Sequence, residues 1–223
     1  MKYIPAPHRR AAGFTLVEMA VVLMIVGLLL GGMLVPLSAQ MEQQKISETR
    51  KTLDEIQQAL IGYAIVNGRL PYPAKATLVS SVDANAGLAD STLTSGVLPW
   101  ATLGTSETDA WGRRFTYSVA GAFTTTFTLA SNGTLSVKNA ATGGSGLASN
   151  IPAVVVSHGS NGLGGYTPQG VQLPLSGDPD EADNSNGGAT FVSHDFTPTF
   201  DDLVIWLSPN ILFNRMVAAG RLP

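Results

Sequence analysis

The sequence predicts an α+β protein, in which one long N-terminal helix continues into a globular head that contains an antiparallel β-sheet. The first observation is an apolar run, residues 19–37, without a charged or polar side chain. At a rise of about 1.5 Å per residue, a helix of this length covers roughly the hydrocarbon thickness of a bilayer. The second is an apolar stripe at helical spacing that follows the run. The third is a series of short apolar segments separated by Gly, Ser, Thr and Pro, which favours strands.

Composition excludes several classes of site. The 223 residues include no cysteine, so a disulfide, a thiolate metal site and a cysteine nucleophile are all impossible. Lys2, Arg9 and Arg10 are three of the thirteen basic residues, which leaves ten against sixteen acidic residues after Gly13, a net charge of −6. A surface of this sign disfavours nucleic acid as a partner and is compatible with binding a cation.

Residues 1–13 form a basic leader (MKYIPAPHRRAAG) that begins like a secretory signal. An ordinary signal has an apolar core of about 7–15 residues. The run here is longer, so an uncleaved signal anchor is one interpretation. The positive-inside rule places Arg9 and Arg10 in the cytoplasm and the bulk of the chain on the other side of the membrane.

Glu18 stands at the start of the apolar run. An ionised group costs on the order of 2.5–3.5 kcal/mol at the bilayer centre and less near the interface. The acid persists more easily with a cationic partner, and cutting the Gly13–Phe14 bond would supply one as a free amino group on Phe14. Amine and acid are four residues apart, so a neighbouring subunit shifted along the axis could pair with either.

The segment from Arg9 to Glu18 (RRAAG followed by FTLVE) resembles the leader and processing site of type IV pilins and type II secretion pseudopilins. The resemblance implies cleavage after Gly13 by a prepilin peptidase, N-methylation of Phe14, and pairing of Glu18 with the Phe14 amine of an adjacent subunit. The expected parts are a cleaved leader (1–13), a transmembrane and assembly helix (14–39), its soluble half (40–67), and a β-rich head with an acidic C-terminal loop (68–223).

Small residues interrupt the apolar run. Gly27 and Gly31 are four residues apart, a spacing that lets membrane helices approach closely. Pro36 has no N–H to donate, so we expect the helix to be weak or kinked there. In pilin-like filaments the corresponding stretch partly melts on assembly. Glycines are also common in membrane helices without such a role.

The apolar stripe predicts that the helix continues to Val66, for a total length of about 80 Å. Its members are Ile46, Thr49, Leu53, Ile56, Leu60 and either Tyr63 or Ala64. The opposite face carries charges one turn apart, which indicates a solvated face. Asn67-Gly68 and Pro71 predict the helix end.

The head is predicted to contain strands joined by polar loops. We expect strands that end at Val119 and cover 123–129, 134–137, 151–157 and 203–207, irregular segments at 75–96 and 140–150, and a short helix at 210–220. Asn132-Gly133 predicts a hairpin turn between the second and third strands. Asp109-Ala110-Trp111-Gly112 resembles the Asp-Pro-Trp-Gly turn of pseudopilin heads, with alanine in place of proline.

Acidic residues accumulate near the C-terminus, because seven occur between Lys138 and Arg215, where no Lys or Arg is found. Crowded carboxylates repel one another unless a cation or water separates them, and Ca²⁺ binds loop oxygens at irregular spacings. A solvated acidic loop is the alternative. Residues 157–165 and 200–206 resemble the C-terminal loop of major pseudopilins, which holds a structural Ca²⁺ in that family. The candidate ligands are Asp178, Asp180, Asp183, Asp201 and Asp202.

Catalysis has little support, because His158 and His194 each adjoin their candidate partner in sequence and no Gly-x-Ser-x-Gly elbow exists. We expect a structural subunit of a pilus-like filament, most similar to type II secretion pseudopilins, and no required cofactor. A major or minor type IV pilus subunit for adhesion, motility or DNA uptake is the nearest alternative. A singly anchored extracytoplasmic binding protein or hydrolase is another.

The resemblance also implies partners and a location. The partners would be other pilins or pseudopilins in a homo- or hetero-oligomeric filament, a prepilin peptidase, the inner-membrane assembly machinery and the membrane itself. The N-terminus would be cytoplasmic and the head outside the cytoplasm, on a single pass through the bacterial inner membrane. The assembled filament would stand in the periplasm or at the cell surface.

Overall fold

The computed structural model describes residues 13–222, and it describes residues 30–37 only as helix backbone. The elements are, in chain order, α1 (Leu16–Asn67), β1 (Ser95–Val97), α2 (Trp100–Leu103), β2 (Thr116–Val119), the 3-10 turn η1 (Gly121–Phe123), β3 (Leu135–Lys138), β4 (Gly146–Ile151), β5 (Ala153–Ser157), α3 (Pro179–Ser185), β6 (Thr190–Val192), β7 (Leu203–Leu207) and α4 (Pro209–Ala218). The contacts divide the chain between Gln44 and Lys45 into an N-terminal unit and a head unit.

The long helix α1 confirms the predicted helix to within two residues at each end. It is assigned as helix without a break through Pro36, and the weak or kinked helix expected there stays a prediction. At its C-terminal end Gly68 adopts a φ of 70°, and its N–H donates to the carbonyl of Ala64 at 2.8 Å. Glycine takes this left-handed conformation without steric cost, which explains why the helix ends there.

The predicted stripe forms the helix side of the core. Its buried members in the head unit are Thr49, Leu53, Ile56, Leu60 and Ala64. The structure selects Ala64 rather than Tyr63 for the last position and adds Ile61 to the buried face. On the outer face Lys51 and Glu55 form an exposed ion pair at 3.8 Å, as the one-turn spacing predicts.

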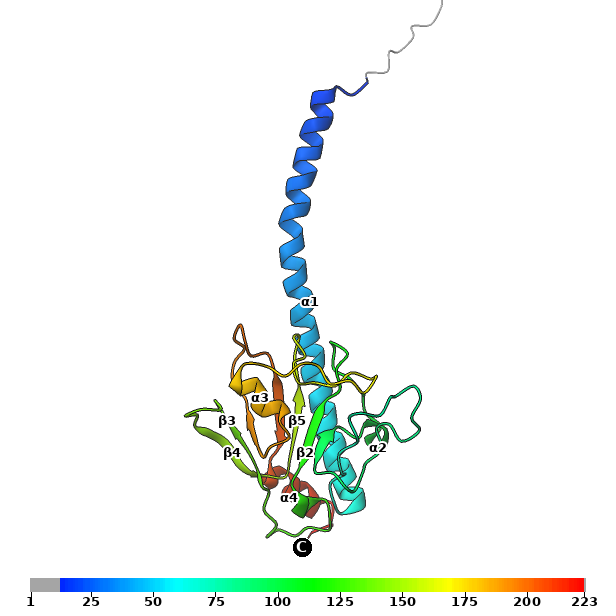
Figure 1. Cartoon of the computed structure of the whole chain (residues 1–223), viewed down its shortest axis with the longest axis vertical. Helices are drawn as coiled ribbons and strands as arrows, with labels where there is room; N and C mark the ends of the chain where they lie inside the picture. The colour runs from blue at the N-terminus through cyan, green and yellow to red at the C-terminus, as the bar shows by residue number, and fades with distance from the viewer. Residues whose placement is uncertain (1–12, 223) are drawn as a thin grey trace, which may run out of the picture. The chain divides into compact units, whose positions relative to one another are not determined.

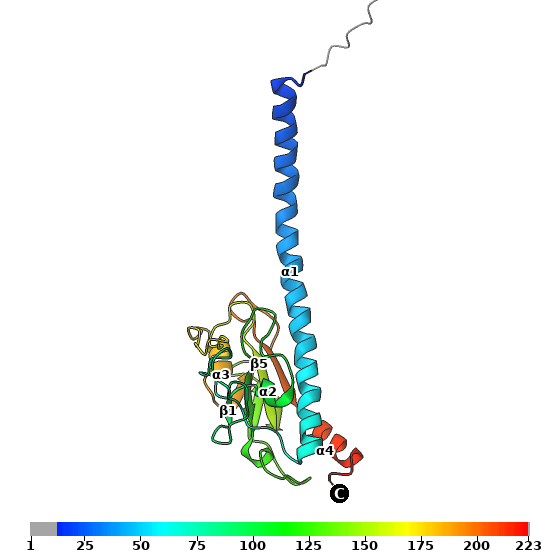
Figure 2. The same cartoon turned by 90° about the vertical axis from the view of Figure 1, so that its right-hand side faces the viewer.

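A four-stranded antiparallel sheet in the order β1-β2-β5-β7 packs on this part of α1. Figures 1 and 2 show β2 and β5 beside the cyan, C-terminal part of the helix. Its central strand β5 is buried on both faces, because Ala153 and Val155 join the core cluster of the helix while Val154 and Val156 join a second cluster. This explains why residues 151–157 form a continuous apolar run rather than an alternating one.

The second cluster lies between the four-stranded sheet and a smaller sheet in the order β4-β3-β6. Helix α3 is joined to β6 through Asn184, whose side chain donates to the carbonyl of Val192 at 2.9 Å and accepts from its N–H at 2.8 Å. Figure 2 shows α3 on the side of β5 that faces away from α1. The acidic segment that contains α3 therefore lies on the face of the four-stranded sheet opposite α1 (Figure 2).

The prediction of a strand at 123–129 was wrong. Gly121–Phe123 forms the turn η1, and the following residues are irregular. Their aromatic rings are buried in the core, with Phe123 and Phe127 at a centroid distance of 4.9 Å and Phe213 of α4 6.0 Å from Phe123. The apolar spacing in this stretch reflects aromatic packing against α4 and not a pleated strand.

The predictions of a hairpin turn at Asn132-Gly133 and of a flexible loop at 140–150 were also wrong. Strand β3 pairs with β4 and with β6 instead of with the preceding segment, and β4 begins at Gly146, inside the expected loop. Its small residues carry no strand pattern, because β4 is mostly exposed and is held on β3 by backbone pairing and by burial of Ile151 at its end. The β3–β6 pair is parallel, so the head is not uniformly antiparallel.

Other elements went unpredicted, namely β1, α2, α3 and β6. Each is short, and α3 lies within the expected acidic loop. The strands ending at Val119, Ser157 and Leu207 are confirmed as β2, β5 and β7, and the third predicted strand as β3. The tail helix is confirmed as α4, which follows Ser208 and has Pro209 in its first turn.

Candidate functional site

The pairing of β5 with β7 brings a histidine and an acid together at one end of the main sheet. Ser157 pairs with Leu203, so the next residues outward, His158 and Asp202, are neighbours. Each lies two residues beyond a valine that faces the second cluster, so both face α3. The His158 Nδ1 and Asp202 Oδ1 atoms are 3.8 Å apart, and both side chains are almost completely buried.

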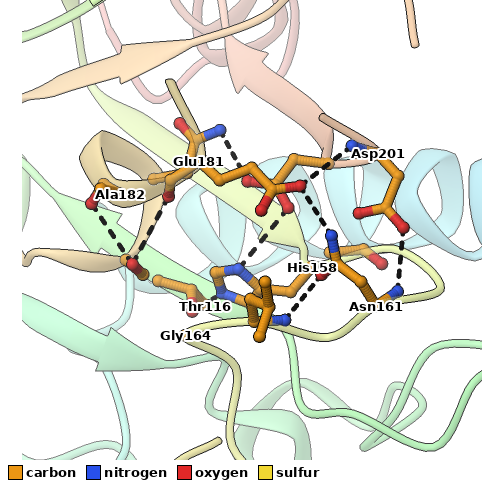
Figure 3. A network of polar contacts seen from close by, with 12 residues as sticks. Thr116, His158, Asn161, Gly164, Glu181, Ala182 and Asp201 are labelled. Atoms are coloured by element: carbon orange, nitrogen blue, oxygen red, sulfur yellow. Dashed lines mark hydrogen bonds and ion pairs between the residues drawn. The ribbon is translucent and has the colours of Figure 1, made fainter. Parts of the chain in front are cut away.

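Two further carboxylates join them. Asp201 Oδ2 accepts from the Ser160 N–H at 2.8 Å, the Ser160 hydroxyl at 2.7 Å and the Asn161 N–H at 2.9 Å. Glu181 Oε1 accepts from the Asn161 side-chain amide at 2.8 Å and from the Asp201 N–H at 3.1 Å. Figure 3 shows Glu181, Asp201, Asn161 and His158 directed toward one another.

Glycine makes the close approach of the loop possible. Gly159 has a φ of 56°, and a Cβ atom there would lie 2.6 Å from Asp201 Oδ1. A side chain at this position would therefore collide with Asp201. The positive φ would in addition strain the backbone of any residue other than glycine. The loop after β5 consequently folds tightly onto Asp201.

Each of the three acids keeps one oxygen without a hydrogen-bond partner among the described residues. These oxygens are Glu181 Oε2, Asp201 Oδ1 and Asp202 Oδ1, and His158 Nδ1 is unpartnered in the same way. One oxygen from each acid lies within 4.8 Å of the others, a spacing that would admit a metal ion. Buried polar atoms are rarely left unpaired, so such a cluster calls for a ligand or water.

Burial shifts the pKa values of His158 and Asp202. It lowers the pKa of His158 to about 4, which leaves the imidazole neutral at pH 7. Burial raises the pKa of Asp202 well above its usual range, with repulsion from Glu181 and Asp201 acting in the same direction against a hydrogen bond from Asn184. The ionised form of Asp202 is therefore poorly stabilised by the protein alone.

The structure brings together only two of the five candidate ligands, Asp201 and Asp202. Asp178 caps α3 by accepting from the Asp180 N–H at 2.9 Å. Asp180 contacts His194 at 3.1 Å, and Asp183 accepts from the Asn186 side chain at 3.1 Å. These three acids have local partners and do not belong to the three-carboxylate group.

Sequence reasoning missed Glu181 as a member of the group and His158 as its neighbour. Glu181 was counted among the seven acids, but only a helix at 179–185 turns it inward. His158 directly follows the buried strand, and its position two residues beyond Val156 was the available signal. The three carboxylates fit the oxygen chemistry of Ca²⁺, whereas the histidine nitrogen is a donor that Ca²⁺ does not require.

The Asp-Ala-Trp-Gly turn at 109–112 links the four-stranded sheet to α1 through hydrogen bonds. Asp109 Oδ1 accepts from the N–H groups of Trp111 and Arg113, and its Oδ2 accepts from the Ser157 hydroxyl at 2.7 Å. The Ala110 N–H donates to the Thr49 hydroxyl of α1 at 3.3 Å. The turn closes through hydrogen bonds to Asp109, and alanine in place of proline is tolerated there.

The residues predicted to serve processing and assembly lie in the N-terminal unit. Gly13 and Phe14 precede α1, and Phe14 is exposed. Glu18 and Thr15 form a capping box, because Thr15 Oγ1 accepts from the Glu18 N–H at 3.2 Å and Glu18 Oε2 accepts from the Thr15 N–H at 2.8 Å. The Glu18 carboxylate therefore already accepts a hydrogen bond from one backbone N–H, that of Thr15, at the N-terminal end of α1.

The remaining assembly residues are only partly described. A Cβ atom added at Gly27 would meet nothing within 4 Å, so this position is open. Gly31 and Pro36 lie among residues 30–37, outside the described side chains. Within the part of the chain that the structure describes, no helix combines the length and hydropathy that a membrane crossing requires.

Comparison with protein families identifies the chain. The model for the prokaryotic N-terminal methylation motif matches residues 8–34, and that for type II secretion system (T2SS) protein G matches residues 37–153, just over half of the sequence. No curated protein and no solved structure matches. The second match ends before His158, so it does not reach the carboxylate cluster. The chain therefore belongs to the type II secretion system protein G family, one of the pilin and pseudopilin families.

Proposed function

We propose that this protein is a structural subunit of a type II secretion pseudopilus, cut between Gly13 and Phe14 and polymerised through the N-terminal part of α1. The observation that carries the proposal is the processing-site motif followed directly by apolar side chains that the chain itself leaves uncovered. Those among the described residues, 43–87% exposed, are Phe14, Leu16, Val17, Met19, Val21, Val22, Leu23, Met24, Ile25, Val26, Leu28 and Leu29. Lipid before assembly and neighbouring helices after it would cover them.

The capping box gives Glu18 a second reason to be present, and this determines the experiment. Glutamine at the third helical position preserves a capping box, whereas valine removes it. If pairing with a neighbouring Phe14 amine is what matters, Glu18→Gln and Glu18→Val both abolish assembly, because both remove the charge. We expect this result, measured as the yield of sheared filaments under overexpression.

Two controls accompany the assembly experiment. Glu55→Gln removes an exposed carboxylate from the head part of α1 and should leave filament yield unchanged. Intact mass of each variant should correspond to a chain that begins at a methylated Phe14. Wild-type yield from Glu18→Gln would show that Glu18 serves only as a cap, and a mature protein that begins at Met1 would contradict processing altogether.

We further propose that Glu181, Asp201 and Asp202 hold a divalent cation that stabilises the head, with Ca²⁺ the first ion to test. A ligand that binds only the folded state at 100 times its Kd adds about 2.7 kcal/mol. In a protein of this size, that raises Tm by roughly 5–10 °C. Melting the full-length protein in detergent with EDTA, and then with excess CaCl₂, should reveal a shift of this order.

Variants of two acids distinguish the cluster from the general acidity of the region. Asp201→Asn should remove the Ca²⁺-dependent rise in Tm. Asp183→Asn, which alters a half-buried acid outside the cluster that is bonded to Asn186, should retain it. Equal Tm values with EDTA and with CaCl₂ would exclude a stabilising Ca²⁺ site.

A further inference from the structure

The histidine beside the carboxylates changes which cation the site should prefer. We propose that His158 is a fourth ligand and that the site selects a divalent transition-metal ion, Mn²⁺ or Zn²⁺, over Ca²⁺. This inference rests on the proposed cation site and adds a nitrogen ligand to it. The group then comprises the imidazole of His158 and the carboxylates of Glu181, Asp201 and Asp202, from three separate segments of the head unit.

The imidazole lies beside the three carboxylates whose oxygens are within 4.8 Å of one another. His158 is completely buried, and its Nδ1 has no hydrogen-bond partner among the described residues while lying 3.8 Å from Asp202 Oδ1. Its other nitrogen, Nε2, is 2.7 Å from the Thr116 hydroxyl of β2. Metal-ligating histidines regularly donate the second ring N–H to a polar group, which fixes the tautomer and orients the free nitrogen. Thr116 would fill that role here.

The carboxylates are held in a matching way. Asp201, Asp202 and Glu181 each direct one oxygen to a fixed donor, from Ser160, Asn184 and Asn161 respectively, and each leaves the other oxygen unpartnered. No ion pair among the described residues joins any of these three acids to a lysine or an arginine. Three carboxylates gathered without a basic side chain repel one another, and a bound proton or a bound cation relieves that repulsion.

The donor set favours the ion. Ca²⁺ is bound by six to eight oxygens, and imidazole is not among its usual ligands. Zn²⁺ accepts imidazole nitrogen with carboxylate oxygen, and oxygen-rich sites of this kind also suit Mn²⁺. His158 Nδ1 would contribute little to binding of Ca²⁺, which is bound by oxygen ligands. The same nitrogen would form a coordinate bond to a transition-metal ion. The ordering expected for this site is therefore Mn²⁺ and Zn²⁺ above Ca²⁺.

The first test measures selectivity. The full-length protein in detergent is stripped with EDTA, exchanged into metal-free buffer, and melted with CaCl₂, MnCl₂ or ZnCl₂ at equal free concentrations. MnCl₂ and ZnCl₂ should raise Tm more than CaCl₂. His158→Asn should weaken Mn²⁺ and Zn²⁺ binding by at least about 10- to 100-fold, the range seen when mere supporting contacts of a ligand are lost. The response to CaCl₂ should not change.

A matched control and a spectroscopic readout keep the result interpretable. His194→Asn alters the other histidine of this region, which contacts Asp180 outside the carboxylate cluster, and should retain the Mn²⁺ and Zn²⁺ responses. In wild-type protein loaded with MnCl₂, pulsed electron paramagnetic resonance should detect coupling of the Mn²⁺ electrons to one ¹⁴N nucleus. This measurement needs no variant, so it remains decisive if His158→Asn fails to fold.

The outcomes separate this inference from the proposals beneath it. A larger Tm rise with CaCl₂ than with MnCl₂ and ZnCl₂, or Mn²⁺ bound without ¹⁴N coupling, would overturn the histidine ligand and leave a Ca²⁺ site standing. No Tm rise with any of the three salts would overturn the cation site itself. Filament assembly, tested through Glu18, is independent of both.

Discussion

Replacing Arg114 with methionine is expected to lower the free energy of unfolding by about 3–5 kcal/mol, because it removes one partner of a buried charge network. The guanidinium is completely buried and donates to Glu107 at 2.9 Å, to the Ala76 carbonyl at 2.7 Å and to the Pro168 carbonyl at 3.0 Å. It also lies 4.7 Å from the Trp100 ring centroid. One side chain thus joins loops that are otherwise held together by isolated β-bridges and single backbone hydrogen bonds.

Lys51→Met is the matched control, because it also removes the basic partner of an ion pair but at an exposed position, beside Glu55. Comparing the two variants shows how much of the effect is due to burial. The Lys51 and Glu55 side chains are 80% and 64% exposed, and such a pair contributes about 0.3–0.5 kcal/mol. Urea unfolding of both variants, followed by circular dichroism of the full-length protein in detergent, gives the two free energies. A loss below about 1 kcal/mol for Arg114→Met would mean that the loops find other partners.

Replacing Phe123 with alanine is expected to cost about 3–5 kcal/mol, since a large aromatic side chain leaves a cavity where it was fully buried. Its ring packs against both Phe127 and Phe213, and its backbone carbonyl accepts from the Leu70 N–H at 2.7 Å. The contact joins η1 to α4 and to the segment after α1. Loss of the ring would weaken the packing among these three segments.

Phe196→Ala is the matched control, because the same truncation at a side chain that is 40% exposed leaves no closed cavity. We expect it to cost less than about 1 kcal/mol in the same urea experiment. Equal losses at the two positions would show that the aromatic cluster is not a stabilising part of the core.

Much of the fold was predictable because its signals are local and periodic. The buried positions of α1 recur every three or four residues, and Gly68 ends the helix where the Asn-Gly pair predicts. Strands β5 and β7 carry β-branched and aromatic residues in short runs. The error at 123–129 has the same origin, since aromatic residues spaced for burial resemble a strand until their partner Phe213, distant in sequence, is known.

The candidate site was less predictable because its members come from distant segments. Asp201 and Asp202 were expected as ligands, but Asp178, Asp180 and Asp183 found local partners when α3 formed. Backbone hydrogen bonding of a seven-residue helix decided which acid points inward, and the sequence carries no strong pattern for so short an element.

By itself, the sequence determined the processing motif, the acid at the head of the apolar run, the long helix and the central strand. These features depend on residue type and on spacing along one segment. The tertiary structure alone decided that Glu181 joins Asp201 and Asp202 and that His158 lies beside Asp202, because strand register and the docking of α3 on β6 set that arrangement. Contacts between residues far apart in the chain leave no periodic trace in the sequence, and the cluster became apparent only when the fold brought its members together.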